Sequence, residues 1–155
     1  MGTQAGYQTR RNRADIINIE MAEDYIERAK RYIREAERAF LEGDFPTTVR
    51  RSQESLEPGV KAVLRDLAIE YPREHDVGDA LHELETKVPA YLEREIPTFK
   101  ELLSELARAR GPAMYGYERE GIPPRKAFRE EYAGEKLKVV KKLLALCARF
   151  VAENN

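Results

Sequence analysis

The stretch from Asp44 to Asp76 constrains the fold of this chain most, because it has the pattern of one long amphipathic helix. A helix of roughly 27 residues would be about 40 Å long, and Pro72 is expected to end it. Pro58 lacks an N–H group, so we expect a kink near Glu54. Apolar side chains at steps of three and four residues form one stripe, at Phe45, Val49, Leu56, Val60, Val63, Leu64, Leu67 and Tyr71. We expect the rest of the chain to be arranged around this helix.

Helical periodicity continues on both sides of this stretch, and the sequence shows no strand pattern or internal repeat. The expected helices run from between Arg13 and Ile19 to about Glu42, from Val77 to Thr86, from Pro89 to about Glu95, from Pro97 to about Arg110, and from between Arg129 and Gly134 to about Ala152. Gly43 fits the position after a helix and Asp44 fits a cap, so the first two helices are expected to be antiparallel neighbours. Asp76 is likewise expected to cap a helix, with His75 as a structural residue before it. The sequence therefore predicts an all-α fold, an up-and-down antiparallel bundle of four to five helices.

The chain of 155 residues has the length of one domain. Residues 1–12 show no periodicity and are expected to be a mobile N-terminal segment, which leaves residues 13–155 as the helical domain. No apolar run is long enough to span a membrane and no hydrophobic signal segment is present, so we predict a cytoplasmic protein. Abundant Arg, Glu and Lys beside a single Cys favour a heat-adapted source, a thermophile.

Cysteine and histidine are too few for the common metal sites. Cys147 lies on an apolar stripe and is interpreted as a small core residue. His75 and His82 have no further Cys or His near them in the sequence, so no metal site is expected. No glycine-rich phosphate loop is present, and we predict no cofactor.

Residues 111–124 hold three Gly and three Pro and are interpreted as a long loop, which is uncommon unless it is functional. The charge is uneven around this loop. Residues 1–107 carry 16 Lys and Arg against 22 Asp and Glu, whereas residues 108–142 carry 10 against 5. The basic segment suits an anionic ligand such as nucleotide or RNA. The alternative is that acidic residues of neighbouring helices neutralise it.

Four pieces of sequence, in this order and spacing, resemble the HEPN family (higher eukaryotes and prokaryotes nucleotide-binding) over residues 19–153. They are MAEDYIERAKRYIREAERAFLEGDF, SQESLEPGVKAVL, YPREHDVGDAL and ARARGPAMYGYEREGIPP, the last similar to archaeal members. The resemblance implies a HEPN-like bundle, usually a homodimer, that binds nucleotide or RNA in a cleft near its second and fourth helices. Many members are toxin-type endoribonucleases. Others are partners of nucleotidyltransferases of the MNT type, in toxin–antitoxin-like pairs.

The ribonuclease motif of the family is an Arg followed four to six residues later by a His. Arg110 stands at the Arg position, but the three positions that follow at this spacing are Tyr115, Gly116 and Tyr117. Cleavage of RNA needs a group that takes the 2′-hydroxyl proton near neutral pH, and Tyr, with a pKa near ~10, is a poor choice. This departure from the family motif argues against the usual ribonuclease activity, and no catalytic residue is assigned.

The ligand-binding candidates are Arg110, Tyr115, Tyr117, Arg51, Gln53, Glu57 and Lys61. Arg110 suits a phosphate and the tyrosines suit a base, whereas Glu57 and Lys61, four residues apart, also fit a plain surface pair. Three functions remain open. The first is a homodimer that binds nucleotide, RNA or a nucleotidyltransferase without the usual cleavage. The second is an endoribonuclease with a diverged site using Arg110 with Tyr115 or Tyr117, and the third is a pure protein-interaction module.

Overall fold

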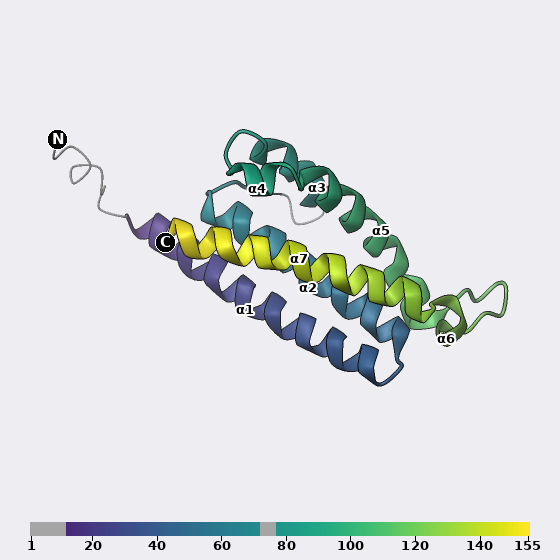
Figure 1. Cartoon of the computed structure of the whole chain (residues 1–155). Coiled ribbons are helices and arrows are strands. Elements are labelled where there is room, and N and C mark those ends of the chain that lie inside the picture. Colours follow the sequence, from purple (N-terminus) through teal and green to yellow (C-terminus); the bar gives the residue numbers. More distant parts are fainter. Residues whose placement is uncertain (1–11, 72–76) are drawn as a thin grey trace, which may run out of the picture.

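A computed structural model describes residues 12–71 and 77–155. Within them the chain forms four long helices, α1 (Arg13–Leu41), α2 (Phe45–Asp66), α5 (Ile96–Tyr115) and α7 (Glu130–Asn154). They run alternately up and down, as Figure 1 shows. This arrangement confirms the predicted all-α bundle. Among the described helices, none is both long and apolar enough to cross a membrane.

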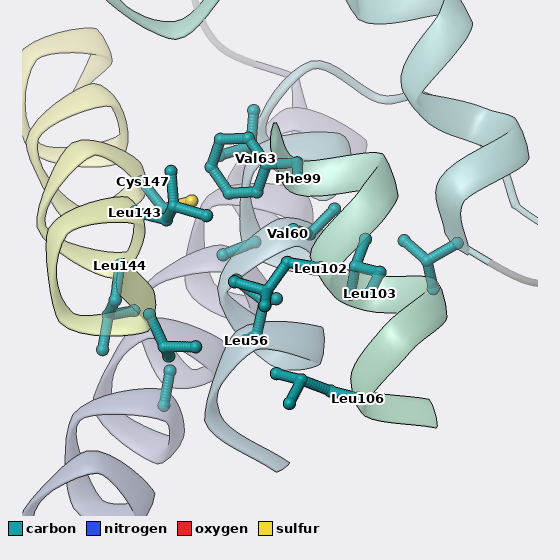
Figure 2. Packing of buried hydrophobic residues seen from close by; sticks show 14 of the residues in the cluster. Leu56, Val60, Val63, Phe99, Leu102, Leu103, Leu106, Leu143, Leu144 and Cys147 are labelled. Carbon is teal, nitrogen blue, oxygen red and sulfur yellow. The ribbon is translucent and has the colours of Figure 1, made fainter. Parts of the chain in front are cut away.

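Helix α2 is the centre of the bundle and packs against α1, α5 and α7. Every one of its residues is buried or half-buried. Figure 2 shows that Leu56, Val60 and Val63 of α2 pack between side chains of two other helices. These are Phe99, Leu102, Leu103 and Leu106 of α5 and Leu143, Leu144 and Cys147 of α7. Gly59 lets α7 approach closely, because a Cβ there would lie 3.1 Å from Leu144 Cδ1. Cys147 is a core residue as predicted, and burial raises the pKa of its thiol to about 12.

The turn between α1 and α2 follows the sequence prediction. Gly43 has a φ of 77° and closes α1: its N–H bonds the Phe40 carbonyl, and the Asp44 N–H bonds the Ala39 carbonyl at 2.9 Å. Asp44 Oδ1 then accepts a hydrogen bond from the Thr47 N–H at 3.1 Å and caps α2. The predicted mobile segment lies outside the described residues except for Asn12, which caps α1.

The prediction that α2 extends to Tyr71 is wrong, because the helix ends at Asp66. Ala68 has a φ of 55°, its N–H bonds the Arg65 carbonyl, and the Ile69 N–H bonds the Leu64 carbonyl at 2.9 Å. These two bonds satisfy the last carbonyls of the helix and turn the chain so that Ile69 is buried. The expected roles of Pro72, His75 and Asp76 lie outside the described residues. Pro58 is inside α2, which continues past it.

The single helix predicted from Val77 to Thr86 is also wrong. The chain forms a short α3 (Val77–Ala80) and a 3₁₀ turn, η2 (Leu81–Leu84). Leu81 and Leu84 are three residues apart and both buried, which is the spacing that a 3₁₀ turn places on one side. The predicted stretch to Glu95 is shortened to α4 (Ala90–Glu93).

The prediction that residues 111–124 are all loop, and that the preceding helix ends at Arg110, is wrong as well. Helix α5 continues through Gly111 and Pro112 to Tyr115, and it buries Ala113 against the bundle. Pro112 removes one helical hydrogen bond, a loss that this contact offsets. A turn joined by a Tyr117–Ile122 bridge follows, and then a short α6 (Pro124–Ala127) that the sequence did not indicate. The last helix, α7, has the predicted bounds.

Candidate functional site

The neighbours of α2 leave one of its sides partly exposed, and that side is polar. Ser55 Oγ donates to the Ala29 carbonyl of α1 at 2.8 Å, and Gly59 faces Leu144 of α7. Leu56 packs among the leucines of α5. Helical spacing places a separate row of side chains between the α5 side and the α1 side. This row, the polar strip, consists of Arg50, Gln53, Glu54, Glu57 and Lys61.

Three of the predicted site residues are joined along the polar strip. Gln53 Nε2 donates to Glu57 Oε2 at 3.1 Å, and Glu57 Oε1 lies 3.1 Å from Lys61 Nζ. Gln53 is 7% exposed, and its Oε1 is buried without a hydrogen-bond partner. A buried acceptor with no donor costs about 1–3 kcal/mol. A ligand that donates a hydrogen bond to this oxygen after a small local movement would remove that cost.

Arg51 stands where the polar strip meets α1, and carboxylates hold it from both helices. It pairs with Glu54 on α2, and its Nε lies 3.0 Å from Glu35 Oε2 on α1. The hydrogen bond to Glu54 is the main cause that raises the pKa of Arg51 above its ordinary value. The guanidinium also lies 5.8 Å from the ring centre of Tyr32. Arg51 is therefore a fixed cation that positions Glu54, which also pairs with Arg50 at 3.1 Å.

Arg110 lies on the flank of α5 that faces the polar strip. The other flank of α5 turns to α7, where Glu105 pairs with Lys136 at 2.7 Å. Arg110 is four residues before Met114 and so shares its side of the helix. Met114 and Arg50 together line a hollow of about 620 Å³ beside the α1–α2 turn. Arg110 is exposed and makes no ion pair with another described residue.

The two tyrosines of the predicted site do not lie with Arg110. Tyr117 lines a different hollow, of about 240 Å³, together with Arg108, Phe128 and Tyr132. Tyr115 is 63% exposed at the end of α5 and belongs to the side that faces away from the bundle. The structure thus joins Gln53, Glu57 and Lys61, holds Arg51 against Glu54 and Glu35 at the α1 edge of the strip, and places the end of α5 that carries Arg110 near Arg50. It separates both tyrosines from this group.

Neighbouring helices neutralise part of the basic segment, as the alternative interpretation predicted. Lys136 pairs with Glu105 of α5, Lys141 with Glu37 of α1 at 3.6 Å, and Lys142 with Glu95 at 3.1 Å. The cations of this segment that form no ion pair with described residues are Arg108, Arg110, Arg119, Arg125, Lys126, Arg129 and Lys138. Apart from Lys138, they come from the end of α5, the turn, α6 and the residue before α7.

Sequence reasoning missed Arg50 and Glu54 as members of the polar strip. The signal was present, because Arg50, Glu54, Glu57 and Lys61 follow steps of four, three and four on one helix face. Glu35 had no such signal, since its contact with Arg51 depends on how α1 packs against α2. Among the residues that the structure describes, no group of three or more His, Cys, Asp or Glu could hold a metal ion.

Comparison with known proteins finds a matching family and a similar solved structure. The HEPN domain family matches residues 22–150. The crystal structure of TT1696 from Thermus thermophilus is similar to this chain with a TM-score of 0.60 and 24% sequence identity. The similarity covers 86% of this chain and 98% of that one and shows a shared fold. No curated protein matches the sequence.

Proposed function

This chain belongs to the HEPN domain family, and on that premise we propose that it binds RNA or a nucleotide at the polar strip of α2, with Arg110 as the phosphate contact. One observation carries the proposal. An exposed arginine without an ion pair among the described residues lies one helical turn before Met114, which shares a hollow with Arg50 at one end of a row of hydrogen-bonding side chains on the central helix. A guanidinium with free donors can bind a phosphate bidentately.

The polar strip is expected to orient the ligand through hydrogen bonds rather than to attract it by net charge. Its cations are already paired, Arg50 with Glu54 and Lys61 with Glu57. A paired carboxylate and the amide of Gln53 still offer acceptors and donors to the edge of a base or to a ribose hydroxyl. Arg110 is then the contact for the charged part of the ligand, and affinity is expected to fall as salt rises because phosphate contacts release counterions.

We propose that the protein binds without the cleavage typical of the Arg-x(4–6)-His motif. Neither tyrosine that stands in place of the His faces the side of α5 that carries Arg110. His82 is on η2, with a side chain that is 81% exposed, and His75 lies outside the described residues. This geometry also gives no support to a diverged site built from Arg110 with Tyr115 or Tyr117.

The test is a titration of ATP and of a short single-stranded RNA at low and moderate salt. Replacing Arg110 by Ala is expected to weaken RNA binding by about 1.5–3 kcal/mol, the range for a hydrogen bond to a charged group. The melting temperature is expected to change little, because Arg110 is exposed. Arg94→Ala is the matched control, since Arg94 is also an exposed arginine but lies beside α4.

If Arg94→Ala weakens binding as much as Arg110→Ala, the ligand responds to overall charge and the site is not at Arg110. If neither ligand binds the wild type, a pure interaction module replaces the binding proposal. Prolonged incubation of the RNA completes the experiment: the proposal expects an intact strand, whereas cleavage that Arg110→Ala abolishes would restore the ribonuclease alternative.

We further propose that the protein is a homodimer through the end of α5 and the turn after it. Large apolar side chains are exposed there: Met114 39%, Tyr115 63%, Tyr117 44% and Ile122 37%. Light scattering at micromolar concentration tests this, and a stable monomer would contradict it. An MNT-type nucleotidyltransferase, as in a toxin–antitoxin-like pair, is the proposed partner on the ground of family resemblance, and co-purification from the source cells tests that pairing.

A further inference from the structure

A second concave site lies near the C-terminal end of α2, apart from Arg110. It is a hollow of about 540 Å³ between α1 and the end of α2, lined by Asn18, Met21, Tyr25, Lys61, Arg65, Ala68, Ile69, Glu70 and Tyr71. This volume is in the range of small-molecule sites, about 300–1,000 Å³. Lys61 is eleven residues beyond Arg50, which corresponds to about 16 Å along the helix. The hollow therefore lies at the end of the polar strip away from Arg50 and shares only Lys61 with the strip.

The side chains of this hollow are rich in hydrogen-bond donors. Lys61 and Arg65 carry positive charge, and Tyr25, Tyr71 and Asn18 add neutral donors. Arg65 Nε is buried without a hydrogen-bond partner, so part of the capacity of its guanidinium is unused. Lys61 Nζ lies 5.5 Å from the ring centre of Tyr71, which holds the ammonium group at the wall of the hollow.

Tyr71 stays protonated at neutral pH. Burial, and after it the neighbouring Tyr25, raise the pKa of Tyr71 to about 12. A neutral phenol donates a hydrogen bond and does not repel an anion. Among the described residues, the carboxylates at the hollow are Glu70, which is solvent-exposed, and Glu57, which pairs with Lys61 at 3.1 Å. Arg65 forms no ion pair with a described residue, so its charge is the one that a ligand meets unpaired.

We infer that this hollow binds the phosphate or carboxylate group of a small molecule between Lys61 and Arg65, with the tyrosine hydroxyls and Asn18 as further donors. Met21 and Ile69 give the ligand an apolar wall next to the charged group. Two cations and three neutral donors suit an acceptor with several oxygens. The inference does not depend on RNA binding at Arg110.

Calorimetric titration at constant ionic strength tests this site, with inorganic phosphate and acetate as separate probes. One of them is expected to bind saturably to the wild type, and the probe that binds identifies the group. Arg65→Gln is expected to weaken binding at least about tenfold, since it removes a charged hydrogen bond. Tyr71→Phe keeps the ring and is expected to weaken binding several-fold.

Arg94→Ala is the matched control: Arg94 is an exposed arginine beside α4, and this variant is expected to bind the probe like the wild type. Arg65→Gln separates the two sites: it loses phosphate or acetate binding if this inference holds and keeps RNA binding if the proposed function holds. Absence of saturable binding of both probes to the wild type would overturn the inference, as would equal affinities for the wild type, Arg65→Gln and Tyr71→Phe. Asn18→Ala replaces Arg65→Gln if the latter does not fold.

Discussion

Helix α2 and the segment 111–129 show two ways in which sequence determines structure in this protein. Along α2 every residue is buried or half-buried, and packing on three sides decides what each position tolerates. Along 111–129, Ala113 and Phe128 are buried, whereas the other side chains are half-buried or exposed and backbone geometry decides. Periodicity describes the first region well. The path of the chain in the second region depends on φ angles and on the burial of Ala113 and Phe128, and helical periodicity in the sequence does not indicate either.

The largest effect is expected from a charge in the core of α2. Leu56 is 1% exposed, so Leu56→Asp places a carboxylate where it has no partner and is expected to cost about 4 kcal/mol or more of a stability of about 5–15. Thermal unfolding measures it. Leu41→Asp is the control, because Leu41 is 86% exposed and is expected to tolerate the charge. Equal melting temperatures for the two variants would mean that α2 is not the centre of the bundle.

A backbone substitution tests the second region. Gly116 has a φ of 70°, and a Cβ there would lie 2.0 Å from the Ile122 carbonyl oxygen. Gly116→Ala is expected to destabilise the protein by about 2–3 kcal/mol through strain and this contact. Gly121 has a similar φ of 68° with no atom within 4 Å of its Cβ position, so Gly121→Ala isolates the conformational cost, about 1 kcal/mol. A Gly116→Ala effect no larger than that of Gly121→Ala would contradict the close turn.

The cap of α2 is expected to matter less than its core. Asp44→Ala removes the acceptor for the Thr47 N–H and is expected to cost about 1 kcal/mol in chemical denaturation. Asp44→Asn keeps an acceptor oxygen and is expected to stay close to the wild type. If Asn fails as badly as Ala, the contribution of Asp44 is its charge rather than the cap.

The smallest expected change is at Gly111. It is inside α5, and apart from its chain neighbours a Cβ there would meet no atom within 4 Å. The usual gain of about 0.5–1 kcal/mol from Gly to Ala in a helix is opposed by Pro112, because the ring of a proline crowds the Cβ of a helical residue before it. Gly111→Ala is therefore expected to change the free energy of unfolding by less than about 1 kcal/mol in chemical denaturation. A loss as large as that of Gly116→Ala would contradict this balance.

The parts of the fold that were predicted correctly from the sequence are those in which neighbouring residues all favour the same local structure. At the α1–α2 turn, Gly43 ends one helix and Asp44 with Pro46 starts the next, and the structure follows all three. The end of α2 lacks such a signal, since Ala68 takes a positive φ that Gly or Asn would ordinarily supply. The extension of α5 contradicts its local signal, because Gly111 and Pro112 are helical in a segment that buries Ala113.

The same distinction applies to the candidate sites. Gln53, Glu57 and Lys61 belong to one helix, so their spacing alone was enough to bring them together. The position of Tyr117 depends on a turn closed by Ile122, and the hollow near Arg65 depends on where the chain goes after Ala68. Helical periodicity in the sequence could predict neither the position of Tyr117 nor the hollow near Arg65.

The rate at which the buried thiol of Cys147 reacts can report how often the folded bundle opens. Thiol reagents attack the thiolate, and this side chain is 1% exposed with a pKa raised to about 12, so the folded protein is expected to react extremely slowly. Modification must then wait until α7 separates from α2 at Gly59, or until the residues of η2, α4 and α5 that line a small apolar cavity with Cys147 move away. The labelling rate of the wild type, followed over increasing denaturant, would therefore report whether Cys147 is uncovered by a local opening or only when the whole bundle unfolds.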